Sequence, residues 1–315
     1  MEETSSRRER VNRLKRAILA IAAVAVMVPT VVCVIFGLRT LELSGKVKDL
    51  EEQLFAEKSR NAEASGVYTM AEVRESSRDP EAERMTEQRR RMEEAEEYEK
   101  KVYLTFDDGP SSNTDAILDI LREYDVKATF FVVGKTDERS KAAYQRIVAE
   151  GHTLAMHSYS HNYSEVYASK ESFINDLTSL QEYLYEVTGV WPRFYRFPGG
   201  SSNVVSQVDI QELIGWLEEN GITYFDWNTA SGDAVSEELS SETIVNNCLA
   251  NLDSQRRCMI LMHDAQEKQT TVEALPEIIS RVRRRGDAYF LSITDDTVPI
   301  QHLLKSHTKE DSTAN

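Results

Sequence analysis

A regular alternation of short apolar runs and amphipathic segments between residues 101 and 292 constrains the fold more than any other feature of the sequence. Seven runs are typical of strands, at residues 101–106, 128–133, 153–156, 193–197, 222–226, 258–262 and 289–292. Helical segments lie between them, near residues 113–124, 138–150, 170–188, 207–220, 241–252 and 272–285. Strands joined through helices run parallel, so the pattern predicts an α/β fold. Both an open sheet and an incomplete barrel fit this alternation.

The folded core is predicted to lie in the same C-terminal part of the chain. Of the 26 aromatic residues, 22 fall between residues 101 and 315. By contrast, residues 39–98 are polar and rich in Glu and Arg, which is typical of a solvated helix. We therefore interpret residues 39–98 as a helical stalk, in which Val47, Leu50 and Leu54 also allow a short coiled coil. What the stalk contacts cannot be predicted from the sequence.

The N-terminal region predicts a membrane anchor. Residues 17–38 contain no charged side chain, and about 20 such residues suffice to span a bilayer. Residues 1–16 hold six basic and three acidic side chains, so the positive-inside rule predicts a cytoplasmic tail there. We expect a single-pass protein of the cell membrane whose C-terminal domain lies outside the cytoplasm. The alternative is a cleaved signal peptide, which normally has a shorter apolar region and an A-x-A-like cleavage site.

The charge balance argues against a nucleic-acid partner. The chain has 37 basic and 53 acidic residues and a net charge of −16, whereas phosphate binding needs clustered Lys and Arg. The two cysteines of the exported part, Cys248 and Cys258, leave two interpretations open. They either form a disulfide or are small buried apolar residues.

Four of the predicted strands run into unusual polar residues at their carboxyl ends. They are Asp107 and Asp108 after the first strand, His157 and His161 after the third, Arg196 at the fourth and His263 after the sixth. Taken singly, each has an ordinary interpretation as a turn residue, a surface ion pair or a buried structural histidine. However, the carboxyl ends of parallel strands share one edge, where the sites of α/β proteins lie. The sequence therefore predicts one site built from four separate segments.

The two histidines after the third strand suggest a metal site. His157 and His161 are four residues apart, a spacing at which two imidazoles can share one face of a helical turn and bind one ion. With Asp108 they form an Asp-His-His set, and three protein ligands leave the open position that catalytic zinc needs. An iron oxygenase triad uses the same ligand types, but its usual H-x-D spacing is missing here.

Together these segments resemble the NodB-homology polysaccharide deacetylases, carbohydrate esterase family 4, over about residues 99–295. Residues 105–110 (Thr-Phe-Asp-Asp-Gly-Pro) are similar to the first motif of that family, T-F-D-D-G. Residues 157–161 (His-Ser-Tyr-Ser-His) resemble the second, H-[ST]-x-x-H. Residues 196–199 (Arg-Phe-Pro-Gly) resemble the third, R-x-P-x, and residues 261–263 (Leu-Met-His) the fifth, L-x-H. One such motif is weak evidence, whereas four in the family's order are specific.

The resemblance implies a distorted (β/α) barrel, here of about seven strands. It also implies that Asp107 is the general base, that Arg196 orients and tunes this base, and that His263 is the general acid. The metal ligands that it implies are Asp108, His157 and His161. The metal is usually Zn²⁺, with Co²⁺ or another transition metal as alternatives.

The sequence departs from the family's pattern in two places. Gly199 stands where the third motif often has a Tyr; its N–H can still bind the oxyanion, but one ring wall of the groove is missing. The fourth motif, usually D-x-x-D-W, has two candidates for the Asp that orients His263, namely Asp226 and Asp233. The spacing after the preceding strand favours Asp233, with Ala234 in place of the Trp. The substrate-side residues that the resemblance implies are Gly199, Trp227 and Leu261.

The implied activity is metal-dependent removal of N-acetyl groups from an acetylated glycan. An anchor, a stalk and an exported domain favour N-acetylglucosamine units of peptidoglycan as the substrate. N-acetylmuramic acid, chitin-like oligomers, poly-N-acetylglucosamine and O-acetyl xylan remain open. The alternative from another class is a catalytically silent, glycan-binding scaffold of the cell envelope.

These expectations divide the chain into five parts. They are a cytoplasmic basic tail (residues 1–16), a transmembrane helix (17–38), a polar helical stalk (39–98), a NodB-like polysaccharide deacetylase domain (99–295) and a polar C-terminal tail (296–315). The tail contains His302 and His307, which we expect to be solvated because the residues around them are polar.

Overall fold

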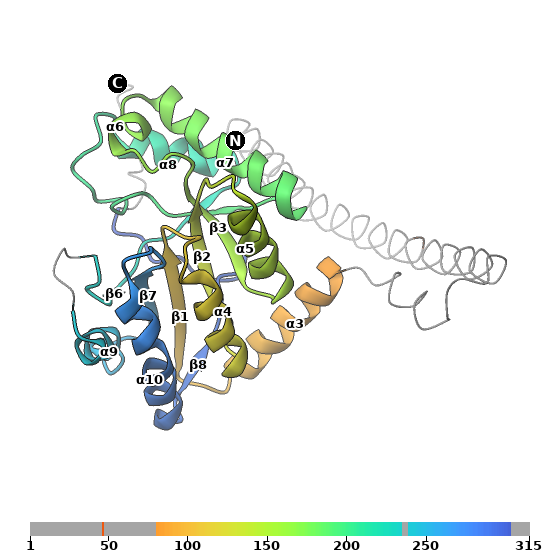
Figure 1. Ribbon diagram of the computed structural model, residues 1–315, viewed down its shortest axis with the longest axis vertical. Helices are drawn as coiled ribbons and strands as arrows, with labels where there is room; N and C mark the ends of the chain where they lie inside the picture. Colours follow the sequence, from red (N-terminus) through yellow and green to blue (C-terminus); the bar gives the residue numbers. More distant parts are fainter. Residues whose placement is uncertain (1–45, 47–79, 235–238, 304–315) are drawn as a thin grey trace, which may run out of the picture. The chain divides into compact units, whose positions relative to one another are not determined.

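The computed structural model describes residue 46, residues 80–234 and residues 239–303 (Figure 1). The predicted cytoplasmic tail, the predicted transmembrane helix and most of the predicted stalk lie outside these residues. None of the helices within the described ranges is long and apolar enough to cross a membrane. The chain divides into two compact units, Met1–Glu83 and Arg84–Asn315, and every strand described here belongs to the second.

The strands of this second unit form one curled, parallel sheet. They are β1 (Lys100–Asp107), β2 (Thr129–Val133), β3 (Thr153–Ser158), β4 (Phe194–Tyr195), β5 (Thr223–Tyr224), β6 (Thr229–Ala230), β7 (Arg257–His263) and β8 (Ala288–Phe290). Their hydrogen-bonded order is β5-β4-β3-β2-β1-β7-β6, and β8 pairs with the beginning of β1. Every one of these pairings is parallel, which confirms the predicted α/β fold. The sheet curls into an incomplete barrel with β5 and β6 at its two ends, so the predicted distorted barrel is confirmed as well. Only β6 was not predicted, since its two residues are too few to form a pattern.

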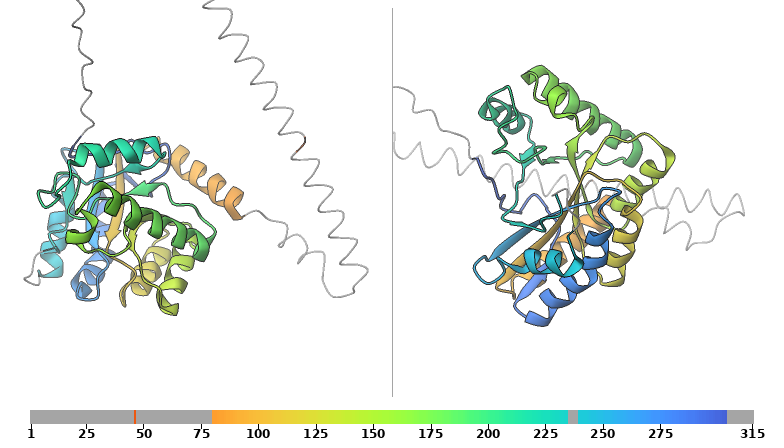
Figure 2. Two further views of the ribbon diagram at one scale, coloured as in Figure 1. Left: turned by 90° about the horizontal axis from the view of Figure 1, so that it is seen from above. Right: turned by 60° about the vertical axis from the view of Figure 1, so that its left-hand side comes forward.

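Helices cover the outer side of the sheet (Figures 1 and 2). They are α4 (Thr114–Glu123), α5 (Glu138–Ala149), α6 (Tyr163–Val166), α7 (Lys170–Thr188), α8 (Ile210–Glu219), α9 (Ser241–Leu249) and α10 (Gln269–Arg285), and α3 (Pro80–Ala95) precedes β1. Neighbouring helices contact one another in the order α9, α10, α4, α5, α7 and α8. Local signals set their ends: the Ser169 side chain caps α7 by accepting the N–H of Ser172, and Gly189 ends it with a φ of 71°.

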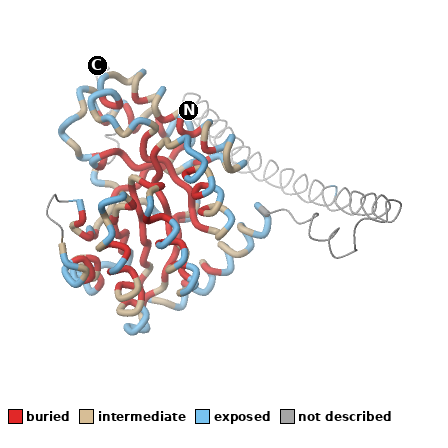
Figure 3. Tube along the Cα trace, in the orientation of Figure 1, coloured by how far each residue is buried: buried red, intermediate tan, exposed pale blue. Residues whose placement is uncertain are grey.

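The alternation of side chains along β1 divides the interior into two layers. Leu104 and Phe106 point outwards and pack with Ile117 of α4 in the larger core, between strands and helices. Tyr103 points inwards and joins a smaller core inside the barrel that includes Phe131. Both faces of the strands are therefore buried, as Figure 3 shows along the sheet, which explains why these strands read as continuous apolar runs.

The pairing of β1 with β7 sets the positions of two predicted site residues. The strands run side by side from Lys101 and Arg257 to their carboxyl ends, where Asp107 lies opposite His263. Parallel register thus brings together residues that are far apart in the sequence, at the strand end where α/β sites form.

Cys248 and Cys258 are both buried and free. Burial raises the pKa of the Cys248 thiol and raises that of Cys258 to about 11. The structure thus supports the interpretation as buried apolar residues over a disulfide.

The compact unit extends beyond both predicted ends of the deacetylase domain. On the N-terminal side, Arg91 of α3 is only 7% exposed and its guanidinium donates to the Asp125 carboxylate at 2.7 Å. On the C-terminal side, the carbonyl of Ile300 accepts the N–H of Asp226, and the N–H of His302 donates to the Asp226 carboxylate. His302 is exposed, as expected of a solvated residue, although its backbone N–H is bound to the domain. His307 lies outside the described residues. At Arg91, by contrast, the charged run does not show in the sequence that this side chain will be covered.

A buried histidine predicts that the fold loses stability in acid. His152 is 2% exposed, and its Nδ1 accepts the N–H of Ala128 at 3.2 Å. Burial, with the charge of Lys127 added, lowers its pKa to about 3, whereas in the unfolded chain it titrates near 6.5. The unfolded state therefore binds a proton first as the pH falls below about 6.5, and the free energy of unfolding drops by about 2 kcal/mol between pH 7 and pH 5.

Urea unfolding of wild type and His152→Gln at both pH values, with chelator present, measures this effect. Gln can still accept the N–H of Ala128 but does not titrate, so the variant should lose less stability on acidification than wild type. Equal losses in the two proteins would show that His152 does not contribute to the pH dependence.

Candidate active site

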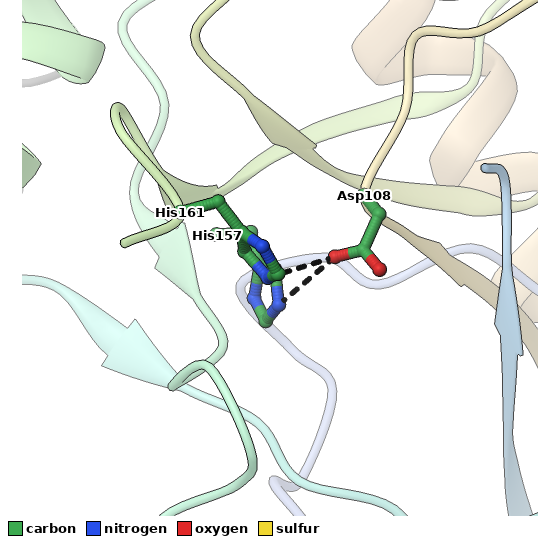
Figure 4. Close-up of side chains that lie close together, drawn as sticks. All are labelled: Asp108, His157 and His161. Carbon is green, nitrogen blue, oxygen red and sulfur yellow. Dashed lines mark ion pairs between the residues drawn. The ribbon is translucent and has the colours of Figure 1, made fainter. Parts of the chain in front are cut away.

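The two adjacent carboxylates at the end of β1 have different surroundings. Asp107 points into the barrel, is 3% exposed and accepts a hydrogen bond from Nη1 of Arg196 at 2.8 Å. At Asp108 the chain turns with a φ of 72°, a left-handed conformation that is uncommon for a non-glycine residue. This turn sends the second carboxylate towards His157 and His161 (Figure 4). One local bend thus separates the predicted base from the predicted metal ligand.

Arg196 is completely buried and every part of its guanidinium is held in place. Nη1 also donates to Oγ1 of Thr105, at 2.7 Å. Nε and Nη2 donate to the carbonyls of Phe225 and Asp226, at 3.0 and 2.9 Å. Such saturation orients the side chain, and with it the Asp107 carboxylate that it contacts.

Asp108, His157 and His161 form a compact set of potential metal ligands. Oδ1 of Asp108 lies 3.1 Å from Nε2 of His161 and 3.5 Å from Nε2 of His157. One ligand atom from each residue lies within 4.8 Å of the others. Figure 4 shows both imidazoles facing the carboxylate from the end of β3. The structure thus brings the three predicted ligands together.

The protonation states of this set fit a metal site. Nδ1 of His157 lies 2.7 Å from the Arg196 carbonyl and so carries the proton, which leaves Nε2 as the ligand atom. Burial lowers the pKa of His157, so the imidazole stays neutral. Burial alone raises the pKa of Asp108, but the contact with His161 and the charge of His157 outweigh it and lower that pKa. Oδ1 of Asp108 is buried and has no hydrogen-bond partner in the described part of the chain, as expected of an atom placed for a cation.

His263 is held by Asp233. Nδ1 of His263 lies 2.7 Å from Oδ1 of Asp233, and the backbone N–H of His263 donates to Oδ2 of the same carboxylate at 2.9 Å. Burial tends to lower the pKa of His263, but the hydrogen bond and charge of Asp233 outweigh it and raise that pKa. The other candidate, Asp226, is bound instead to Ser201 and to the N–H of His302. The geometry therefore favours Asp233, as the spacing did.

The predicted substrate-side residues line the same end of the barrel. Gly199 is exposed and adopts a φ of 76°. Trp227 packs against Gly200, where an added Cβ would lie 2.9 Å from the ring, and its ring centroid is 4.9 Å from that of His302. Leu261 lies on β7, two residues before His263, and is almost completely buried.

Comparison with known proteins decides the family. The family model for polysaccharide deacetylases matches residues 94–214. A peptidoglycan-N-acetylglucosamine deacetylase of Bacillus cereus (strain ATCC 14579) is 32% identical over 193 residues, which are 60% of this chain and 68% of that protein. The chain belongs to the polysaccharide deacetylase family. Members of this family are enzymes that act on acetylated glycans, so the activity class implied by the four motifs is confirmed.

Two further matches support the same family assignment. The protein YheN of Bacillus subtilis (strain 168) is 35% identical over 206 residues, which are 64% of this chain and 70% of that protein. The catalytic domain of peptidoglycan N-acetylglucosamine deacetylase from Eubacterium rectale ATCC 33656 superposes with a TM-score of 0.62 at 36% identity. That match covers 65% of this chain and 93% of the solved domain.

One residue that supports the loop between His157 and His161 was not predicted from the sequence. Asp176 of α7 accepts hydrogen bonds from Oγ of Ser158, at 2.8 Å, and from the backbone N–H groups of Tyr159 and Ser160, at 2.8 and 2.9 Å. It thereby fixes the loop that separates His157 from His161. An acidic residue within an amphipathic helix gives no signal of such a role, because the sequence does not show which loop it will meet.

We expect Asp176→Ala to weaken metal binding. The loop between the two histidines loses three acceptor contacts, and loss of such outer contacts typically costs about 10- to 100-fold in metal affinity. Competition with a zinc chelator gives the dissociation constant. The matched control is Glu182→Ala, which removes an exposed carboxylate from the same helix. Equal zinc affinity in wild type and Asp176→Ala would show that the loop holds its shape without this carboxylate.

Proposed function

We propose that the protein removes N-acetyl groups from a cell-envelope polysaccharide and that N-acetylglucosamine units of peptidoglycan are its substrate. The observation that carries this proposal is the convergence of Asp107, His263 and the Asp108-His157-His161 set at one end of the barrel. The names of the relatives from Bacillus cereus and Eubacterium rectale support the choice of glycan.

The residues present fit a divalent metal, for which Zn²⁺ is our first candidate. Two neutral imidazoles and one carboxylate are ligands that zinc accepts, and three protein ligands leave a position open. Co²⁺ or another transition metal fits the same donors. When bound, the metal supplies a Lewis acid that polarises the acetyl carbonyl and lowers the pKa of water towards about 7.

Asp107 is the proposed general base. Arg196 occupies its Oδ1, so Oδ2 remains to take the proton of the attacking water. The buried guanidinium cannot move without losing its bonds to Thr105 and to two carbonyls, and it therefore fixes the orientation of the carboxylate. The N–H of Gly199, on the exposed turn after Pro198, is the proposed backbone donor to the oxyanion.

His263 is the proposed general acid. Because Asp233 raises its pKa, the imidazolium persists to a higher pH than an isolated histidine would allow. Nδ1 faces Asp233, so Nε2 carries the proton to the leaving amine. Attack on the acetyl carbon and protonation of the nitrogen break the amide bond, and the products are acetate and a glucosamine unit.

Acetate release by the full-length protein tests the reaction and ranks the substrates. Purified peptidoglycan, N-acetylglucosamine oligomers and O-acetyl xylan would each be incubated with zinc and with chelator. We expect zinc-dependent release that is greatest from peptidoglycan. Zinc binding without release from any of these glycans would instead favour the alternative function, a silent glycan-binding scaffold.

We also propose that the protein is anchored in the cell membrane by residues 17–38, with the deacetylase domain outside the cytoplasm. The uncharged stretch and its basic flank support this topology. Protease added to intact spheroplasts should then degrade the domain, and the membrane fraction should retain the uncut N-terminus. A secreted protein that begins beyond Leu38 would show cleavage of a signal peptide.

A further inference from the structure

The short helix α6 places a tyrosine beside the metal ligands. Tyr163 begins this helix directly after the His157–His161 loop. Its ring centroid lies 5.5 Å from that of His161, edge to face, and 6.1 Å from that of Tyr167. The Tyr167 hydroxyl donates to the carbonyl of Pro198 at 2.8 Å. Tyr163 is therefore held between a metal ligand and the support of the turn that carries Gly199.

The ring of Tyr163 fills the space beside Gly199. A Cβ added to Gly199 would lie 3.4 Å from Cε2 and 3.5 Å from the hydroxyl of Tyr163. Gly199 is exposed, and its N–H has no acceptor in the described part of the chain. The sequence predicted a groove that lacks one ring wall at this point, because residue 199 has no side chain. The structure supplies a ring there from a different element.

The hydroxyl of Tyr163 is available to a ligand. It makes no hydrogen bond within the described residues, whereas the hydroxyls of Tyr144, Tyr167 and Tyr183 each donate to a backbone carbonyl. Tyr163 as a whole is only partly buried. At neutral pH the group is a protonated donor.

We propose that Tyr163 is a substrate-contacting residue of the deacetylase: its ring forms the wall of the acetyl-binding groove beside Gly199, and its hydroxyl donates a hydrogen bond to the acetyl oxygen. The phenol keeps its proton throughout and forms no covalent bond. It acts with the N–H of Gly199 as a second donor to the charge that develops on this oxygen. The inference rests on the proposed N-deacetylase function.

Removing only the hydroxyl tests the donor. Loss of one preorganised donor to an oxyanion typically lowers kcat by about 10²–10³-fold, and we expect at least a 10-fold loss in Tyr163→Phe with little change in KM. Tyr163→Ala also removes the wall and should raise KM in addition. The matched control is Tyr185→Phe, which alters a half-exposed tyrosine that contacts Trp191 and should leave both parameters unchanged. All variants should bind zinc as wild type does.

Substrate binding provides the second readout. In the Asp107→Asn background, which is expected to bind substrate without turnover, Tyr163→Ala should weaken binding of an N-acetylglucosamine hexamer at least 10-fold. A wild-type kcat in Tyr163→Phe together with unchanged hexamer affinity in Tyr163→Ala would overturn the inference and leave the proposed function intact. If wild type releases no acetate from any glycan, the proposed function fails, and hexamer affinity alone then decides whether Tyr163 contacts a glycan.

Discussion

Asp107→Asn is expected to lower acetate release by about 10²–10⁴-fold, the range that a general base contributes. Asn keeps an oxygen that can accept the bond from Nη1 of Arg196, so the fold and the guanidinium should remain in place. It cannot take a proton from water, so the loss should appear in kcat and much less in KM.

Zinc affinity of the same variant is the control for this prediction. Asp107 is not among the three proposed metal ligands, so zinc affinity should stay close to that of wild type. Thermal stability should fall, because the buried Arg196 loses its anionic partner, and the rates are therefore compared at a temperature at which the variant is folded. Asp115→Asn, a change in an exposed carboxylate at the start of α4, should leave acetate release unaffected. If Asp107→Asn keeps a wild-type rate, the base is another group and the assignment of this site is wrong.

Asp233→Asn should reduce the rate by a similar factor and also change the pH profile. In wild type the Asp233 carboxylate raises the pKa of His263, so the acid form survives to higher pH. Without that charge the pKa of His263 falls, and the pH above which activity declines should move down. The rate itself falls because the imidazole also loses its orienting partner.

The pH–rate profile of Asp226→Asn separates the two candidate carboxylates. Asp226 contacts Ser201 and the backbone of His302, and no bond joins it to His263. This variant should therefore keep the basic limb of the wild-type profile, even if its stability is lower. A shift in Asp226→Asn with no shift in Asp233→Asn would reverse the assignment.

The strands and the main site residues were predictable because their signals are local. Each central strand is a continuous apolar run, and Asp107, His157 and His263 follow such runs directly. Parallel topology then requires these ends to lie at one edge. The prediction that these residues meet at one edge needs only the order of strands and helices. It is therefore the same for an open sheet and for a barrel.

The residues that were missed depend on contacts between distant segments. Asp176 of α7 acts on the loop that follows β3, on the other side of α6 in the chain. Tyr163 fills space left by Gly199, from which it is separated by α7 and β4. Neither contact follows from periodicity. The helix α6 and the strand β6 are too short to form a pattern. The packing of Arg91 depends on a surface that exists only once the domain has folded.

The choice between Asp226 and Asp233 shows the limit of the sequence most clearly. Both are buried carboxylates that follow short strands, β5 and β6, which are consecutive in the chain. The spacing favoured Asp233 only weakly, because loop lengths between the strands vary. A distance of 2.7 Å to Nδ1 of His263 favours Asp233 much more strongly.

The most direct test of the account is mass spectrometry of muropeptides after purified peptidoglycan is treated with the zinc-loaded protein. We predict that N-acetylglucosamine units lose one acetyl group each, with an equal amount of free acetate, that N-acetylmuramic acid units stay intact, and that Asp107→Asn produces neither change. Unmodified muropeptides from a protein that demonstrably binds zinc would contradict the proposal that peptidoglycan N-acetylglucosamine is the substrate.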